Sequence, residues 1–167
     1  MKLSDELRRA VNIKDCEGVE ELLKSQDVNS VDRDGRTPLI HAILGSPASQ
    51  KLVRLLIDSG ATINMHDKGQ AWTPLHYAAR EQDLEVVKML LEVGAEVEAV
   101  DIFGNTPLIR CVATLDANLA VISILMAYGA DKNKNNNYGI SAFSSLDPRQ
   151  VSIKELFQSD DDGVKLI

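Results

Sequence analysis

Apolar residues occur along the chain in short groups at helical spacing, and polar segments of similar composition separate the groups. A Thr-Pro-Leu triplet begins three groups and Ser-Ala-Phe begins a fourth, at residues 37–39, 73–75, 106–108 and 141–143. The copies lie 33 to 36 residues apart, and a Gly-Ala pair follows the first three in step, at residues 60–61, 94–95 and 129–130. Self-similarity at a fixed period of this length indicates a stacked repeat architecture.

Each period predicts two helices. Threonine is a good helix cap and proline is preorganised for the first helical position, so each Thr-Pro-Leu begins a first helix. Paired apolar residues before each glycine end a second helix, and glycine suits the left-handed position after a helix. Good N-cap types precede the second helices at a constant interval, starting in the N-terminal segment: Asp15, Ser49, Asp83 and Asn118. We therefore predict ten helices in five antiparallel pairs, with almost no strand.

The segment DKGQAWTPLHYAAREQDLEVVKMLLEVGAEVEAVD, residues 67–101, resembles the ankyrin repeat family along almost its whole length. The resemblance implies an all-α ankyrin-repeat solenoid of about five helix-turn-helix repeats, with β-turn-like fingers between them. The family's Thr-Pro-Leu-His form is complete only in the third repeat, and Ile40 and Ile109 replace the histidine elsewhere. The resemblance also implies a single domain over residues 1–167. Its repeats are expected at about 1–31 (an N-terminal cap), 32–66, 67–100, 101–135 and 136–158 (a C-terminal cap), with an acidic tail at 159–167.

Departures from the regular spacing predict local changes. Two residues are added between the paired helices of repeats two and four, and one is added in the finger of repeat three, which carries Trp72. In repeat five the second helix is predicted to start at Asp147-Pro148, with a competing capping box at Ser152 and Glu155. Phe143 is predicted to take a core position. Polar terminal repeats predict a complete solenoid.

Composition and charge narrow the possible roles. The chain has 167 residues and a net charge of −7, and an acidic chain is a poor candidate for binding nucleic acid. It has neither the apolar stretch of a signal peptide nor one of membrane-spanning length. Cys16 and Cys111 are far apart in the sequence, which favours free thiols in a reducing compartment. These features predict a soluble cytoplasmic monomer that binds no membrane.

The sequence predicts neither catalysis nor a cofactor. His41, His66 and His76 lack metal-ligand spacing to a cysteine or to one another, so no metal site is expected. No glycine-rich phosphate loop or nucleophile motif is present. Cys111 stands where the inner helix usually has alanine, and it is predicted to be buried and inert.

The family resemblance implies that a partner is held on a concave face made by the finger tips and the exposed side of the inner helices. We predict that the fingers contribute Arg33, Arg36, Lys68, Gln70, Trp72, Phe103, Asn105 and Tyr138, together with the apolar Ile102 and Ile140. The inner helices are predicted to contribute His41, Tyr77, Arg80, Glu81 and Arg110. This set is aromatic and neutral to basic, because its arginines stand against the acidic Asp34 and Glu81, whereas the outer helices and turns are acidic. Aromatic and arginine side chains are enriched at interface hot spots. Trp72 is interpreted as an exposed finger-tip anchor for the partner, and the alternative is that its ring lies on a neighbouring finger and seals the stack.

The predicted function is that of a non-catalytic protein–protein interaction module, a stoichiometric binder or inhibitor of one partner protein. The chain resembles the short ankyrin proteins of bacteria, some of which are immunity proteins that neutralise a toxin or effector. Two alternatives remain open at this stage. The protein could be an adaptor that links two partners, or a small enzyme that uses groove residues such as His41.

Overall fold

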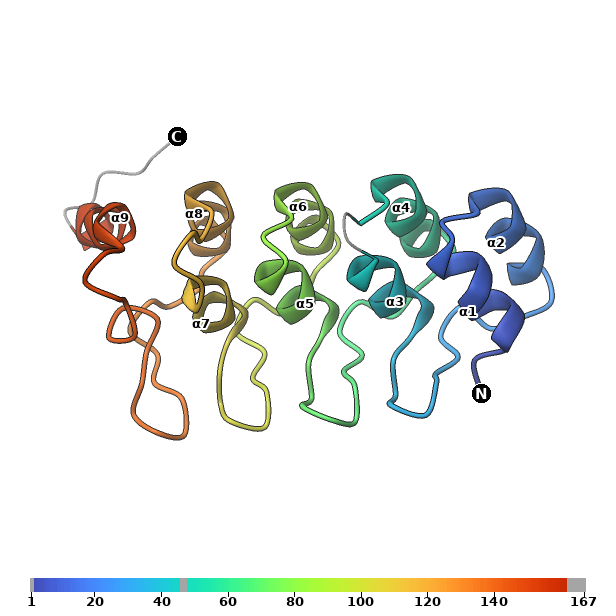
Figure 1. Ribbon diagram of the computed structural model, residues 1–167, viewed down its shortest axis with the longest axis horizontal. Coiled ribbons are helices and arrows are strands. Elements are labelled where there is room, and N and C mark those ends of the chain that lie inside the picture. The colour runs from blue at the N-terminus through green and yellow to red at the C-terminus, as the bar shows by residue number, and fades with distance from the viewer. Residues whose placement is uncertain (1, 46–47, 162–167) are drawn as a thin grey trace.

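The computed structural model describes residues 2–45 and 48–161, and within these ranges nine helices form two layers (Figure 1). The inner layer contains α1 (Asp5–Asn12), α3 (Pro38–Leu44), α5 (Pro74–Arg80) and α7 (Pro107–Val112). The outer layer contains α2 (Cys16–Leu23), α4 (Gln50–Asp58), α6 (Leu84–Glu92), α8 (Leu119–Ala127) and α9 (Val151–Asp161). Each inner helix contacts its outer partner and the next inner helix, so the all-α solenoid is confirmed.

Helix starts follow the predicted caps. The side chains of Thr37, Thr73 and Thr106 each accept a hydrogen bond from the third helical N–H, and proline holds the first turn of each inner helix. The four predicted caps of the outer helices are also confirmed: Asp15, Ser49, Asp83 and Asn118. The sequence therefore predicted where the helices of both layers begin.

Fingers project from the inner layer, away from the outer helices (Figure 1). Each finger is closed by a backbone hydrogen bond from its first residue to the residue before the helix cap, as from Asp101 N–H to the Asn105 carbonyl at 3.0 Å. One backbone bond links each finger to the next: Lys68 to Asp34, Ile102 to Gln70 and Asn137 to Phe103. The fingers thus form a connected row beside the inner helices.

The core lies between the two layers and runs the length of the solenoid. Its fully buried side chains extend from Leu7 in α1 to Phe157 in α9. The prediction that Phe143 is a core residue is wrong, because its side chain is 36% exposed. Phe157 fills the core of the last repeat instead, and its ring centroid lies 6.2 Å from that of Phe143.

Repeat five departs from the prediction of ten helices, because residues 141–145 form only turns within the described chain. Ser144 and Ser145 bond their hydroxyls to the carbonyls of Ser141 and Ala142, and such local bonds compete with helix propagation. The predicted helix start at Asp147-Pro148 is also wrong, since α9 begins at Val151. Residues 147–150 instead form a turn in which the Asp147 N–H donates to the Gln150 side chain.

The extra residue of finger three changes which residue occupies the left-handed position. Gly35, Gly104 and Gly139 hold this position in the other fingers, with φ of +74° to +78°. In finger three Ala71 holds it, with φ of +56°. A Cβ is disfavoured in this conformation by about 1–2 kcal/mol per residue. Finger three is therefore closed at the cost of local strain.

Replacing Ala71 with glycine is expected to raise the free energy of unfolding by about 1 kcal/mol, because glycine adopts this conformation without strain. Urea denaturation of wild type and variant measures the change. The converse substitution, Gly104→Ala, places a Cβ 2.8 Å from the Asn137 backbone nitrogen and should destabilise the protein. Equal stability of Ala71→Gly and wild type would contradict the assigned finger conformation.

The described residues were also examined for strands and for membrane-spanning helices. The described residues contain a single isolated β-bridge, between Lys2 and Val31, in agreement with the predicted near absence of strand. Among those same residues, no helix has both the length and the apolar character needed to cross a bilayer.

Candidate binding face

The first residue of each of three fingers is an aspartate that an inner-helix side chain holds in place. Asp32 Oδ2 lies 2.9 Å from His41 Nε2, and the carboxylate of Asp67 accepts a hydrogen bond from the Tyr77 hydroxyl. Arg110 bonds Asp101 in the same way, with Nε 2.8 Å from Oδ2. His41, Tyr77 and Arg110 each stand four positions after the helix-capping threonine, so this contact recurs in every such repeat. These three predicted binding residues therefore have a structural role in shaping the face.

The finger aspartates are held ionised. Burial by itself would raise the pKa of Asp101, but hydrogen bonds from Arg110, Asn105 and Phe103 outweigh burial and leave the pKa below its ordinary value of 3.8. Asp67 shows the same balance, because the Tyr77 hydroxyl and three backbone N–H groups lower its pKa against the effect of burial. Fixed negative charges thus lie beneath the finger row.

Trp72 is buried, with only 5% of its surface exposed, so the interpretation as an exposed finger-tip anchor is wrong. Its indole Nε1 donates to Asp101 Oδ2 of the next finger at 3.2 Å, and its ring packs edge-on against Tyr77 with centroids 5.0 Å apart. The other interpretation, a ring that seals the stack, describes the structure. Because Ala71 takes the left-handed position, Trp72 stands directly before the helix cap, at the base of the finger.

Two arginines cover the buried indole. The guanidinium carbon of Arg80 lies 5.0 Å from the Trp72 ring centroid, and that of Arg110 lies 4.8 Å from it. Arg110 also lies 5.9 Å from the Phe103 ring, which is 6.4 Å from the Tyr138 ring. Cation–π contacts of this kind contribute about 0.5–2 kcal/mol each. We call this continuous series, across repeats three to five, the arginine–aromatic row: Tyr77, Arg80, Trp72, Arg110, Phe103 and Tyr138.

The predicted binding residues separate into three groups by exposure. Those exposed to solvent are Arg33, Lys68, Gln70, Arg80, Phe103 and Tyr138. Those partly buried are Arg36, His41, Glu81 and Arg110. Those buried are Trp72, Tyr77 and Asn105, whose expected exposure is therefore wrong. Asn105 is buried because its side chain donates to Asp101 and accepts from Asn136 Nδ2 at 2.7 Å.

The structural roles of two glutamines and of the finger aspartates were not predicted from the sequence. The Gln82 side chain joins two repeats, donating to the Cys111 carbonyl at 2.8 Å and accepting from the Asn118 N–H at 2.8 Å. Gln150 fixes the last repeat in a similar way, donating to the carbonyls of Val112 and Thr114. Neither glutamine carries a repeating signal. The finger aspartates do, since an aspartate or asparagine opens the finger before each inner element.

His76 contacts Thr73, the residue that caps α5. The Thr73 N–H donates to His76 Nδ1 at 3.2 Å, so Nε2 holds the ring proton and donates to the Asn105 carbonyl at 3.0 Å. Burial lowers the pKa of His76 from its ordinary value of 6.5, although its hydrogen bond to Asn105 acts in the opposite direction. The imidazole is therefore neutral and structural.

The free energy of unfolding is expected to decrease in two stages as the pH is lowered. Below about pH 6.5 the unfolded chain protonates His76 while the folded chain resists protonation, so the stability gained from the neutral buried ring is lost. Below about pH 4 the unfolded chain protonates the carboxylates of Asp67 and Asp101 first, and their contribution is lost as well. Urea denaturation at each pH measures this profile. A His76→Gln variant with the same slope between pH 7 and pH 5 as wild type would contradict the first stage.

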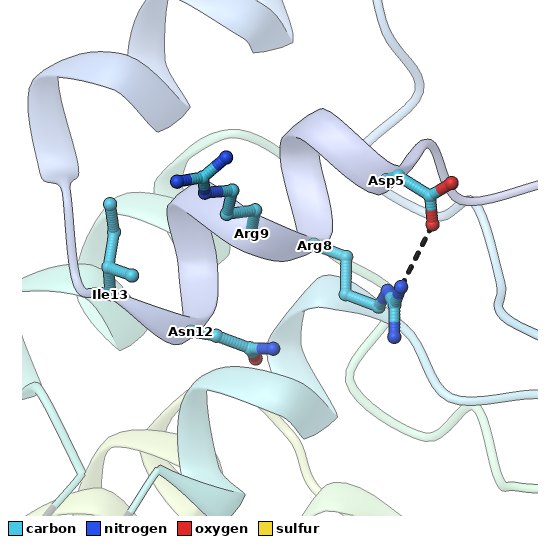
Figure 2. A pocket seen from close by; sticks show the side chains of 5 residues that line it. All are labelled: Asp5, Arg8, Arg9, Asn12 and Ile13. Carbon is cyan, nitrogen blue, oxygen red and sulfur yellow. Dashed lines mark hydrogen bonds and ion pairs between the residues drawn. The ribbon is translucent and has the colours of Figure 1, made fainter.

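A cavity of about 230 Å³ lies between the second and third fingers. It is lined by Arg36, Leu44, Asp67, Gly69, Gln70, Trp72, Tyr77 and Arg80. We call it the finger cavity. A separate hollow of about 350 Å³ lies on α1. Figure 2 shows two of its lining residues, Arg8 and Asp5, paired with one another, and the pair is 2.9 Å long. Ile13, which also lines the hollow, is exposed. That hollow contains none of the predicted binding residues.

The described residues contain no group of His, Cys, Asp or Glu side chains that could hold a metal ion. Cys111 is buried as predicted, and burial raises the pKa of its thiol to about 12, which leaves it protonated and unreactive as a nucleophile. The chemical groups on the face are guanidinium groups, aromatic rings and amides. Such groups can bind another molecule through hydrogen bonds, ion pairs and ring contacts.

Comparison with known proteins supports this picture. A family model described as ankyrin repeats (3 copies) matches residues 7–101 and 48–136. The ankyrin repeat protein FPV024 of Fowlpox virus (strain NVSL) is 29% identical over 155 residues, which are 92% of this chain and 25% of the relative. Ankyrin repeat domain-containing protein 63 of Mus musculus is 32% identical over 114 residues, 65% of this chain and 28% of the relative. Ankyrin repeat and SOCS box protein 6 of Pongo abelii is 33% identical over 100 residues, 57% of this chain and 24% of the relative.

The chain thus spans about a quarter of the length of these relatives. The match to the repeat model covers most of the chain and contains the fingers and inner helices of repeats two to four. The phased caps, the two helical layers and the finger row agree with it at the level of individual residues. This chain belongs to the ankyrin repeat family.

Proposed function

We propose that this protein binds one partner protein through its concave face and acts as a stoichiometric, non-catalytic inhibitor of that partner. Ankyrin repeats are protein–protein interaction modules, and this chain is built from them. The face and the inhibitory outcome are the specific parts of the proposal. We further propose that the protein acts as a monomer in the cytoplasm, where the thiols of Cys16 and Cys111 stay reduced.

The observation that carries the proposal is the apolar surface at the tips of fingers four and five. Phe103 and Tyr138 are 38% and 69% exposed, and Ile102 and Ile140 beside them are also exposed. Contiguous apolar side chains at a surface are typical of interaction sites. The repeat fold does not need an aromatic ring at the position of Phe103 and Tyr138, since Asp34 and Gln70 hold that position, directly before the left-handed residue, in fingers two and three.

Charge supports the same face. The protein carries a net charge of −7, yet the fingers and inner helices present the exposed cations Arg33, Lys68 and Arg80 and the partly buried Arg36, against the carboxylates of Asp34 and Glu81. An acidic chain that presents a basic, aromatic face favours a partner with an acidic and apolar surface. Complementary charge of this kind speeds association and selects the partner.

Inhibition is the outcome that we propose for this binding. An immunity-type role, in which the partner is a toxin or secreted effector, is the form suggested by the resemblance to short bacterial ankyrin proteins. Adding one equivalent of this protein to its purified partner should abolish the partner's activity. Full partner activity in the saturated complex would contradict inhibition and favour an adaptor.

The concave face is tested with a matched pair of tyrosine variants. Tyr138→Ser removes the most exposed aromatic ring of the finger tips, and Tyr128→Ser removes an exposed ring at the C-terminal end of α8 in the outer layer. The affinity for the partner captured from the protein's own cells is expected to fall about tenfold or more for Tyr138→Ser. Tyr128→Ser should bind as wild type does. An equal loss for both variants, or a loss for Tyr128→Ser alone, would place binding elsewhere.

A further inference from the structure

We propose that the finger cavity receives a carboxylate side chain of the partner, while the tips of fingers four and five receive a large apolar side chain from the same extended segment. The inference rests on the proposed function, because it assumes that the concave face binds a protein. It adds the chemistry of the bound segment and the spacing of its two anchors. Three features of the cavity lead to the carboxylate.

The first feature is its charge. Arg36 from finger two and Arg80 from the end of α5 line the cavity, and Asp67 is its one carboxylate. Asp67 is already occupied, since it accepts from the Tyr77 hydroxyl and from the N–H of Gln70 at 2.8 Å. The lining itself carries one more positive charge than negative, and the carboxylates that pair with its arginines, Asp34 and Glu81, are not part of the lining. Its amide, Gln70, is exposed. A negatively charged group suits this lining.

The second feature is an unsatisfied donor. The Nε atom of Arg36 is buried without a hydrogen-bond partner. Its guanidinium lies 3.7 Å from the Asp34 carboxylate through Nη1, a long contact at an exposed aspartate. A buried donor without an acceptor costs stability, and an oxygen acceptor that enters the cavity can relieve that cost.

The third feature is spare capacity on Arg80. Its Nε and Nη2 both donate to one oxygen of Glu81, and this pair is partly exposed. A guanidinium has five N–H donors, so a second carboxylate can bind Arg80 beside Glu81. Contact with Trp72 and Tyr77 holds the guanidinium in place, with centroid distances of 5.0 Å and 5.7 Å. A preplaced guanidinium loses less conformational freedom when a carboxylate binds.

The apolar anchor, at the tips of fingers four and five, lies two repeats away from the finger cavity along the row of fingers. Packed helices are about 8–10 Å apart, so the finger cavity and the tips of fingers four and five are separated by about 20 Å. An extended chain advances about 3.3 Å per residue, which makes this distance about six residues. The bound segment is therefore one with an aspartate or glutamate and a large apolar residue about six positions apart.

The test starts from a displayed library of random peptides of about 15 residues, selected on the full chain, a length that spans both anchors. We expect selected peptides to share a carboxylate and an aromatic or aliphatic residue at the stated spacing. One synthetic peptide and its glutamate-to-glutamine analogue are then titrated against wild type, Arg80→Gln, Arg36→Gln and Arg54→Gln. Arg54 lies exposed in α4 of the outer layer and is the matched control for the lost charge. Emission of Trp72, the one tryptophan of the chain and part of the cavity lining, reports occupancy of the cavity.

The expected result is a coupling between peptide and protein. Arg80→Gln or Arg36→Gln should weaken binding of the glutamate peptide about tenfold, and bind the glutamine analogue as wild type does; Arg54→Gln should change neither. Equal losses for both peptides would overturn the carboxylate assignment. If Tyr138→Ser still weakens the peptides in that case, the proposed function stands and only this inference fails. Two outcomes would count against both the proposed function and this inference. In the first, the selected peptides bind Tyr138→Ser as they bind wild type and leave the emission of Trp72 unchanged. In the second, the selection yields no binding peptide.

Discussion

Replacing Trp72 with alanine is expected to lower the free energy of unfolding by about 3–5 kcal/mol, the range for a large aromatic side chain removed from a core. The indole is buried at the base of finger three, where it packs against Tyr77 and donates to the buried carboxylate of Asp101. The alanine variant loses this packing and removes the surface on which Arg80 and Arg110 lie. The change should therefore loosen the junction between repeats three and four.

Urea denaturation followed by far-ultraviolet circular dichroism measures the loss without relying on tryptophan emission. Trp72→Phe keeps an aromatic ring but removes the N–H donor to Asp101, so we expect a smaller loss, between wild type and alanine. Phe103→Ala, at an exposed finger-tip ring, is the control and should cost less than about 1 kcal/mol. A Trp72→Ala variant as stable as that control would show that the indole is free in solution.

Replacing Leu90 with alanine is expected to cost about 2–5 kcal/mol. Leu90 is fully buried in α6, the outer helix of the most regular repeat, and α6 contacts α4, α5 and α8. The cavity left by a shorter side chain therefore lies at the meeting point of three helices. In a solenoid stability passes through nearest-neighbour interfaces, so the loss should spread to repeats two and four.

Hydrogen exchange resolves this spread by repeat. We expect faster exchange in α4 and α8 of the Leu90→Ala variant, with the denaturation midpoint lowered in urea. Lys88→Ala, at a partly exposed residue of the same helix, provides the comparison. Faster exchange confined to α6 would contradict coupling between repeats, and an unchanged midpoint would contradict the register of the outer helix.

The features that could be predicted from the sequence are local ones. The cap contacts of Thr37, Thr73 and Thr106 reach only three residues along the chain, so the residue types alone determine them. The outer-helix caps and the Thr73–His76 contact are local for the same reason. Because these short-range contacts recur in phase, they specify the architecture as well.

Trp72 could not be placed because its environment comes from the next repeat. Its partner Asp101 is 29 residues away, and Arg110 is farther still. The structural effect of the extra finger residue is to put Ala71 in the left-handed position and Trp72 at the finger base. Exposure at a solenoid's fingers depends on contacts between repeats, which a pattern within one repeat does not contain.

The prediction of an inner helix in repeat five was wrong for a different reason. Its Ser-Ala-Phe triplet aligns with Thr-Pro-Leu, but Ser144 and Ser145 bond the local backbone and the helix does not continue beyond one turn. Gln150 then anchors the last helix to the end of α7 through two carbonyls. Nothing in the local sequence singles out that glutamine, because its partners lie more than thirty residues earlier.

Binding of the partner at the concave face is tested by site-specific photo-crosslinking in the protein's own cells. A photoreactive amino acid is placed at Gln70 and Tyr138 on the finger tips, and at Lys51 and Tyr128 on the outer layer, all exposed positions. If the concave face binds the partner, the same protein adduct forms at Gln70 and Tyr138, and none forms at Lys51 or Tyr128. Adducts that form at the outer positions while the finger tips remain free would contradict it.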